Sequence, residues 1–414
     1  MQRPVLTLIT SLMLAACGGE SNDSAVAFAD KAALGEALFH DVNLSFNGTQ
    51  SCATCHNPEH GFVDNRLGAD DTVRAVSLGD DGVSLGDRNA PSAAYALLIP
   101  PFSEGSRSRI INTSLPEDFQ TYTGYLGGQF WDGRASVLKD QSAGPPLNPI
   151  EMGMPDKASV VARLRENSDY EAAFKRLFDA NLFDDVDAAY AAMAESIAEF
   201  EKTDTFAPFD SKYDRSLLAS NNPDKYTYDI LDKAYTGQVL FFSSDLNCSQ
   251  CHQLNARGNK REPFSSFEYH NIGVPKNAAV RLANGKDNED PDYVDTGLKD
   301  NNSNATAETD AGKFRVPSLR NVAITGPYMH NGVFQNLDTV IKFYDSKLPN
   351  SIFTINPETG VEWAAAEVAD NISDADLLHS NKLDQAKVDA LVCFLRTLTD
   401  KRYEALLPED GLCD

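Results

Sequence analysis

One short motif occurs twice and constrains the fold of this chain more than any other feature. The sequence CATCH occupies residues 52–56, and the sequence CSQCH occupies residues 248–252. In the pattern Cys-x-x-Cys-His, two thiols bond covalently to a haem and the histidine becomes an axial ligand of its iron. Zinc sites or disulfides would use similar cysteine pairs, but a histidine directly after both pairs favours haem. The predicted haem-binding residues are Cys52, Cys55, His56, Cys248, Cys251 and His252.

The length and the two motifs predict two domains. Cytochrome c domains are small and mainly helical, because a buried haem supplies much of their apolar core. We therefore expect a mainly α fold with two cytochrome c-like helical domains, each with one covalently bound haem. Turn-forming residues at 206–226 mark the expected domain crossing, so the domains are 31–205 and 227–414. Outside the two haem motifs, no internal repeat is evident in the sequence.

The N-terminus predicts export. Residues 4–16 form an apolar run that is too short to span a bilayer, and we expect residues 1–16 to be a signal peptide. The cysteine at the end of this run completes a lipobox-like stretch, so Cys17 is expected to carry lipid, with 17–30 as a tether. An ordinary signal peptide followed by a free cysteine is the alternative. Since Gly18 follows and not Asp, we expect a periplasmic or cell-surface lipoprotein, anchored at the outer membrane.

Cysteine use fits an oxidising compartment. Of the seven cysteines, the haem motifs and the lipid site leave Cys393 and Cys413. These two either form a disulfide that pins the C-terminal tail or remain isolated thiols, and the compartment favours the disulfide.

The chain is acidic, with a formal net charge of −25. This charge argues against nucleic acid or an anionic membrane as a partner. We therefore expect membrane contact only through the lipid anchor, while a basic protein partner is compatible with the charge.

Four longer stretches resemble the bacterial di-haem cytochrome c peroxidase superfamily, including its MauG branch. They stand at residues 34–56, 88–92, 130–153 and 314–344, in the family's order. The resemblance implies two haem c groups. The N-terminal haem would react with hydrogen peroxide, and the C-terminal haem would store or relay an electron.

The same resemblance assigns roles near the first haem. Glu151 falls where the family has a distal carboxylate, which would move a proton between the two peroxide oxygens. Gln141 would support it by hydrogen bonding, and Pro145 would shape the pocket. Trp131 matches an indole between the two haems that passes electrons. Without the resemblance, Glu151 would be a carboxylate at a helix N-terminus or on the surface, and Trp131 would be a core aromatic.

The far ligand of the second haem separates two branches of the family. Ordinary members have Met at the position where Tyr344 stands here, and the MauG branch has Tyr. A thioether favours ferrous iron, whereas a phenolate favours more oxidised iron. We expect Tyr344 to be the ligand, with Met329 as its rival. The ordinary members also carry a distal histidine before the tryptophan motif, and residues 90–130 contain none.

The resemblance further implies a calcium ion. Asn89, Thr325 and Pro327 match its ligand positions, and oxygen ligands suit calcium. Polar loop packing is the alternative reading. His270 and His330 also match family histidines, and we expect them to be structural or supporting residues.

The resemblance favours an enzyme that uses hydrogen peroxide to form high-valent haem iron and oxidise residues, chiefly Trp, of a partner protein. The alternative is a peroxidase that takes electrons from a small cytochrome or cupredoxin. A non-enzymatic electron relay is the third hypothesis. The MauG branch passes oxidising equivalents out through a tryptophan before the second motif, but Leu246 and Asn247 stand there, so the exit route is open.

Overall fold

The computed structural model describes residues 27–109, 120–256, 258–301, 307–378 and 381–413. The expected signal peptide and the lipidation site Cys17 lie outside these ranges. Across the part of the chain that is described, no helix is both long and apolar enough to cross a membrane.

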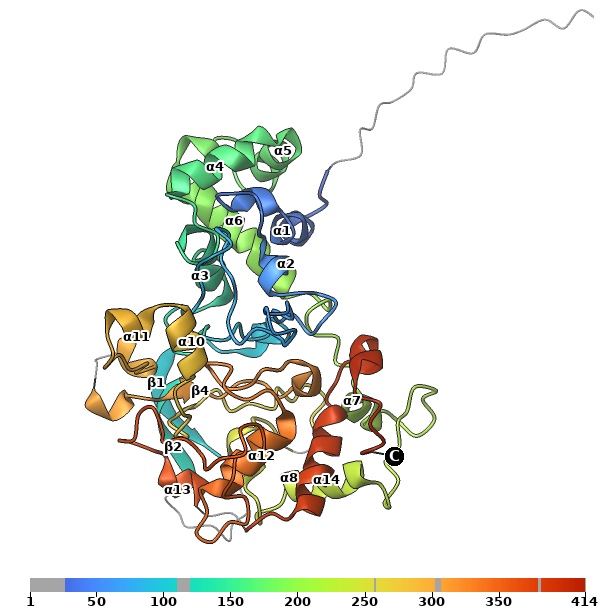
Figure 1. Cartoon of the computed structure of the whole chain (residues 1–414). Coiled ribbons are helices and arrows are strands. Elements are labelled where there is room, and N and C mark those ends of the chain that lie inside the picture. Colours follow the sequence, from blue (N-terminus) through green and yellow to red (C-terminus); the bar gives the residue numbers. More distant parts are fainter. Residues whose placement is uncertain (1–26, 110–119, 257, 302–306, 379–380, 414) are drawn as a thin grey trace, which may run out of the picture.

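The fold is mainly helical, as expected, and its helices gather in two groups (Figure 1). The N-terminal group comprises α1 (Lys31–Phe39), α2 (Cys52–Cys55), α3 (Leu138–Ser142), α4 (Lys157–Glu166), α5 (Ser168–Leu177) and α6 (Val186–Glu201). The C-terminal group comprises α7 (Lys212–Ser216), α8 (Lys233–Phe241), α9 (Cys248–Cys251), α10 (Ala278–Ala283), α11 (Lys286–Glu289), α12 (Leu337–Ser346), α13 (Asp374–Leu377) and α14 (Gln385–Arg396).

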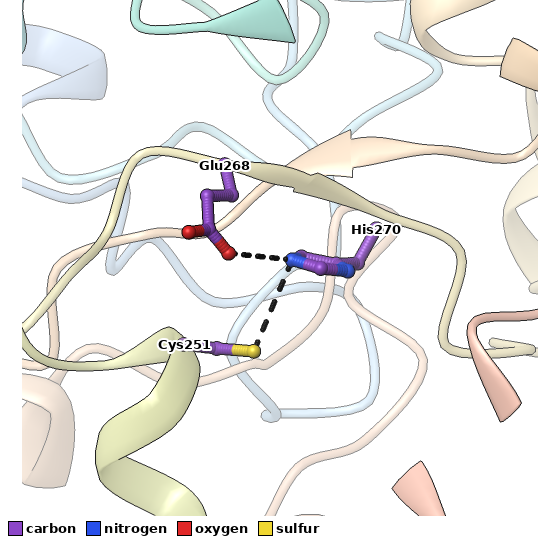
Figure 2. Close-up of side chains that lie close together, drawn as sticks. All are labelled: Cys251, Glu268 and His270. Atoms are coloured by element: carbon purple, nitrogen blue, oxygen red, sulfur yellow. Dashed lines mark hydrogen bonds and ion pairs between the residues drawn. The ribbon is translucent and has the colours of Figure 1, made fainter. Parts of the chain in front are cut away.

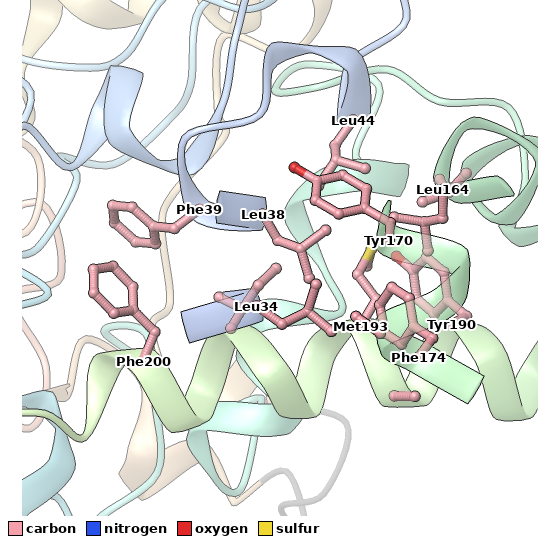
Figure 3. Packing of buried hydrophobic residues seen from close by; sticks show 14 of the residues in the cluster. Leu34, Leu38, Phe39, Leu44, Leu164, Tyr170, Phe174, Tyr190, Met193 and Phe200 are labelled. Atoms are coloured by element: carbon pink, nitrogen blue, oxygen red, sulfur yellow. The ribbon is translucent and has the colours of Figure 1, made fainter. Parts of the chain in front are cut away.

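Each helix group has its own hydrophobic core. The first core draws its residues from the stretch 34–207, and the second draws its residues from 213–398. The change from one core to the other falls inside the expected domain crossing at 206–226. Figure 3 shows the first core, in which Phe39 of α1 packs edge-on against Phe200 of α6 with ring centroids 5.5 Å apart.

Each of the two cores contains an equivalent pair of helices that cross at a glycine. In the first, α1 crosses α6 at Gly35, where an added Cβ would lie 1.9 Å from the carbonyl oxygen of Ser196. In the second, α8 crosses α14 at Gly237, where it would lie 1.8 Å from the oxygen of Ala390. Both glycines precede a Leu-Phe pair by the same spacing. The expectation of no further repeat was therefore wrong. The two halves share the backbone geometry of these helix crossings, and only a few of the residues are identical.

The described residues also form two small antiparallel sheets. Strands β1 (Ser103–Ser108) and β2 (Thr121–Leu126) form a hairpin, and β3 (Tyr269–His270) pairs with β4 (Phe314–Arg315). The hairpin lies in the sequence range expected for the first domain. It nevertheless packs on the C-terminal group, where Leu126 forms a bridge with Glu268.

A buried carboxylate also links the two groups. The hydroxyl of Tyr95, from the N-terminal group, donates to Asp400, and so does the amide of Asn321, at 2.9 Å. Next to them, Arg320 forms an ion pair of 2.8 Å with Asp214. All of these side chains are buried, so the boundary between the groups is a packed polar interface.

The disulfide between Cys393 of α14 and Cys413 is present, which confirms that expectation. It ties the C-terminal tail to the second core.

Adding one methyl group at each helix crossing tests the repeat. Gly35→Ala and Gly237→Ala should each lower the free energy of unfolding by about 3 kcal/mol, because the helices must separate to admit the Cβ. Thermal and urea unfolding of the haem-loaded protein would measure the loss. Gly105→Ala is the matched control, since its Cβ would meet no atom within 4 Å. Equal, small effects at all three positions would contradict the close crossings.

Candidate haem sites and their surroundings

Both haem motifs place their histidine in the same way. Each motif forms a four-residue helix, α2 or α9. Ring atom Nδ1 of His56 lies 3.2 Å from the carbonyl oxygen of Phe62, and Nδ1 of His252 lies 3.2 Å from that of Phe264. When Nδ1 donates to a carbonyl, Nε2 is the free nitrogen that can bind iron. Both residues therefore have the orientation that an axial haem ligand needs.

The two carbonyls are held by an uncommon backbone conformation. Phe62 and Phe264 have φ values of 56° and 52°, a region that bulky residues rarely adopt. Burial lowers the pKa of both histidines, that of His252 to about 4. They are therefore neutral, which is the form that binds a metal.

A serine locks each of these turns, and sequence reasoning did not identify either one. Ser92 donates to the carbonyl of Gly61 at 2.6 Å, and Ser318 donates to that of Pro263 at 2.7 Å. Each acceptor directly precedes the phenylalanine that holds the histidine. The only sequence signal is a Pro-Ser pair in each half, at 91–92 and 317–318.

The second motif opens into a cavity of about 280 Å³. The thiols of this motif form no disulfide. Much of the cavity lining is aliphatic or aromatic, which suits a haem. The lining includes His252, Trp131, Met329, His330 and Tyr344.

Both candidates for the far ligand of the second haem therefore lie in one cavity. Tyr344 comes from α12, whereas Met329 stands in a turn with φ of 70°. Burial, with the sulfurs of Cys251 and Cys248, raises the pKa of the Tyr344 phenol. A trivalent iron would supply the positive charge that lets such a phenol ionise.

Near the first motif, Glu151 is a partly buried carboxyl group. It accepts a hydrogen bond of 2.8 Å from the amide of Asn148. Burial raises the pKa of Glu151, although Arg134 and Asn148 oppose the shift. Burial raises the pKa of Cys52, and the charge of Glu151 makes a small further contribution in the same direction. A carboxyl with a raised pKa is suited to take up and release a proton.

The other residues predicted around Glu151 lie in the stretch of chain just before it. The carbonyl of Gln141, in α3, accepts from Gly144 at 2.9 Å, and that of Pro145 accepts from Met152 at 3.3 Å. The bond from Met152 turns the chain back and brings Pro145 near Glu151, whereas Gln141 lies in the preceding helix α3. Among the described residues, no hydrogen bond joins the side chains of Gln141 and Glu151.

Trp131 contacts residues of both halves, and its position between two haems remains a prediction. Its Nε1 donates to the carbonyl of Asn89 at 2.8 Å, and its own carbonyl accepts from Arg315 at 2.8 Å. Its side chain also lines the cavity of the second motif. The indole is thereby fixed in one orientation.

One of the expected calcium ligands, Asn89, contacts Trp131. Asn89 donates its side-chain amide to Ala75 at 3.0 Å, which leaves its side-chain carbonyl as the candidate ligand. Its backbone N–H donates to His330 at 2.8 Å. Pro327 forms a cis peptide bond with Gly326, which Thr325 directly precedes. Calcium at these residues remains a prediction.

His330 is buried and stacks on Phe314 with ring centroids 3.6 Å apart. Burial lowers its pKa to about 3, so the ring is neutral. Beside it, Arg88 bridges Asp132 and Asp295 at 2.7 Å each. This ion network joins the motif at 88–92 to the C-terminal group.

A second ion network surrounds His270 (Figure 2). Its Nε2 lies 3.0 Å from Glu268. Its Nδ1 lies 3.2 Å from Asp376. Burial alone would lower the pKa of His270, but Cys251 and the two carboxylates raise it well above the ordinary value. Cys251, Glu268 and His270 are close enough to hold a metal ion. Since Cys251 is expected to anchor haem, the cluster is better read as a charged network beside that haem.

The hairpin completes this network, a role that sequence analysis did not foresee. Arg109, which follows β1, pairs with Glu268 at 3.0 Å and with Asp376 at 2.8 Å. Arg107 of β1 pairs with Glu268 at 2.7 Å. The hairpin is thus held against the surroundings of the second haem by buried charge.

Replacing Asp376 by Asn tests this network through pH. Burial alone would raise the pKa of Asp376, but His270 and Arg109 lower it to about 2. A carboxyl whose folded pKa is depressed stabilises the fold above its unfolded pKa and loses that effect as pH falls through the folded pKa. We expect the wild type to exceed Asp376→Asn in unfolding free energy by about 2 kcal/mol more at pH 6 than at pH 2.

Denaturant titrations at the two pH values would measure this difference. Asp187→Asn is the control, because its exposed pair with Lys157 should contribute little at either pH. A pH-independent difference for Asp376→Asn would contradict an ionised, paired Asp376.

Comparison with known proteins gives matches over most of the chain. The sequence profile described as di-haem cytochrome c peroxidase matches residues 29–222. The methylamine utilization protein MauG of Paracoccus denitrificans is 47% identical over 382 residues, 91% of this chain and 90% of that protein. The cytochrome c peroxidase Ccp of Escherichia coli is 30% identical over 315 residues, 76% of this chain and 52% of that protein. Among solved structures, the diheme peroxidase BthA of Burkholderia thailandensis has a TM-score of 0.72 at 28% identity, covering 93% of this chain and 89% of that one.

Proposed function

The chain belongs to the di-haem cytochrome c peroxidase family, and we propose that it uses hydrogen peroxide to oxidise residues, chiefly tryptophan, of a partner protein. Members of this family are peroxide-dependent di-haem oxidoreductases, so the chain is an enzyme of that type. Each of the two cores would hold one haem c through its Cys-x-x-Cys-His motif. When bound, the haems supply the redox chemistry that takes up the oxidising equivalents of peroxide.

The presence of Tyr344 in the cavity of the second motif carries the proposal. A phenolate oxygen is a hard, anionic ligand and stabilises oxidised iron, whereas a thioether stabilises reduced iron. A second haem held by Tyr344 is therefore suited to store oxidising equivalents. The strongest sequence similarity reported above, to MauG of Paracoccus denitrificans, supports the same choice.

Glu151 is the residue that we propose moves the proton. A peroxide must shift one proton from its inner to its outer oxygen before the O–O bond breaks heterolytically. A carboxyl held by Asn148, with a pKa raised by burial, can accept that proton and return it. Gln141 and Pro145 would orient the peroxide and limit the space around it.

Trp131 would pass electrons between the two haems. Its indole lines the second cavity while its N–H is fixed to Asn89. This fixed position keeps the ring in contact with both halves. Calcium bound at Asn89, Thr325 and Pro327 would stabilise the same boundary, and we propose that site as well.

A peroxidase that takes electrons from a small cytochrome or cupredoxin is the second candidate. The similarity to the cytochrome c peroxidase of Escherichia coli favours it. Both candidates use Glu151 in the same way, so they differ in the source of electrons. An electron relay without catalysis gives no task to this carboxyl. We also propose that the protein is an exported lipoprotein anchored at Cys17, at the periplasm or cell surface.

Peroxide added to the fully ferric protein separates the candidates. We expect two equivalents of hydrogen peroxide to remove the ferric optical and EPR signals of both haems without prior reduction. If the ferric protein remained inert and reacted only after one haem was reduced, the ordinary peroxidase would be the correct assignment. In the same assay, Glu151→Gln should slow the reaction by roughly 10²–10⁴-fold. Glu166→Gln, which changes an exposed residue at the end of α4, is its matched control.

Two conservative variants identify the far ligand of the second haem. Tyr344→Phe should change the optical and EPR spectra of the second haem and raise its reduction potential, because an anionic ligand is lost. Met329→Leu should leave both unchanged. The reverse pattern would assign Met329 as the ligand and remove the main support for protein oxidation.

A further inference from the structure

Three tyrosines connect the second haem motif with the surface. Tyr213, Tyr226 and Tyr228 line one cavity of about 360 Å³, which lies beside α7 and α8. Tyr213 is 1% exposed, whereas Tyr226 and Tyr228 are partly exposed. The set therefore runs from the protein interior to solvent.

Tyr213, the buried member of this set, is linked to the predicted haem ligand His252 by one residue, Phe264. The ring of Tyr213 meets the ring of Phe264 edge-on, with centroids 4.9 Å apart. The carbonyl of Phe264 is the group that faces Nδ1 of His252 at 3.2 Å. Tyr213 is thus separated from the axial histidine of the second haem by a single packed side chain.

The outer end is joined to the inner end by Thr397. The N–H of Tyr213 donates to the carbonyl of Thr397 at 3.0 Å, and the hydroxyls of Tyr228 and Thr397 share a hydrogen bond of 2.8 Å. The rings of Tyr228 and Tyr226 then meet edge-on, with centroids 5.0 Å apart. Every step is a direct contact between neighbouring groups.

We infer that Tyr213, Tyr228 and Tyr226 form the route by which oxidising equivalents leave the second haem for a partner protein. The inference rests on the proposed function and names the exit that it requires. Leu246 and Asn247, which precede the second motif, are not readily oxidised and offer no alternative at that place. A phenol is readily oxidised when a nearby base can accept its proton.

The electrons and protons balance along this route. Reduction of one hydrogen peroxide to two waters consumes two electrons and two protons. Tyr226 returns the electrons one at a time through Tyr228 and Tyr213, and its phenolic proton passes to a neighbouring carboxylate. Burial raises the pKa of Tyr226, and the negative charges of Asp232 and Glu404 raise it further. A residue of the partner then gives one electron to each tyrosyl radical, and the phenol regains its proton. In two such steps the partner residue loses two electrons and two protons, and these protons, released to solvent, balance the two that peroxide consumes.

Phenylalanine substitutions keep each ring and remove the phenol group that can be oxidised, which at Tyr228 also removes the hydrogen bond to Thr397. The test uses the haem-loaded protein with ring-deuterated tyrosine, two equivalents of peroxide, and no partner. The wild type should show an EPR radical signal that narrows on deuteration. Tyr226→Phe and Tyr228→Phe should lose that signal, and the oxidised protein should decay on the order of tenfold more slowly. The rate of reaction with peroxide and the haem potentials should not change.

Tyr125→Phe is the matched control, because this tyrosine stacks on Phe102 in the hairpin and takes no part in the route. Tyr213→Phe tests the inner step, and the two outer variants stand alone if the buried change impairs folding. If the wild type is oxidised but all variants decay as it does, the route is wrong and the proposed function stands. If peroxide leaves the ferric wild type unchanged, the proposed function fails and the route fails with it.

Discussion

The hydrogen bond between each motif histidine and a phenylalanine carbonyl is the contact on which the rest of the site depends. It requires Phe62 and Phe264 to adopt positive φ, and it fixes which ring nitrogen can reach iron. Ser92 and Ser318 hold the two turns from behind. A strained backbone persists only where its surroundings over-determine it, and here a serine hydroxyl and a packed core supply that restraint.

The two halves then diverge in what surrounds the histidine. Near the first motif, a loop carries Glu151, whose protonation can change. Near the second, buried charge around His270 is held by arginines of the hairpin, and Tyr344 faces the cavity. The first half is therefore equipped for proton transfer, and the second for holding charge in a fixed arrangement. Trp131 lies where these two environments meet.

Much of this could be predicted from sequence, because covalent chemistry leaves clear residue patterns. The haem motifs, the mainly helical fold and the pairing of Cys393 with Cys413 all follow from a few residue types. The packing of the hairpin could not be predicted, since Arg109 meets Glu268 and Asp376 across long stretches of chain. The sequence alone also could not decide whether Tyr344 or Met329 is the far haem ligand, because both residues line the same cavity.

The matched helix crossings at Gly35 and Gly237 have a consequence for the history of the chain. Each half has, in the same order, a glycine at a helix crossing, a haem motif, a phenylalanine with positive φ, and a Pro-Ser pair whose serine holds the turn before that phenylalanine. Duplication and fusion of a gene for a one-haem ancestor would leave this correspondence. On that account the features shared by both halves were inherited from the ancestor. Residues without a counterpart, such as Glu151 and Tyr344, mark where the two copies diverged in function.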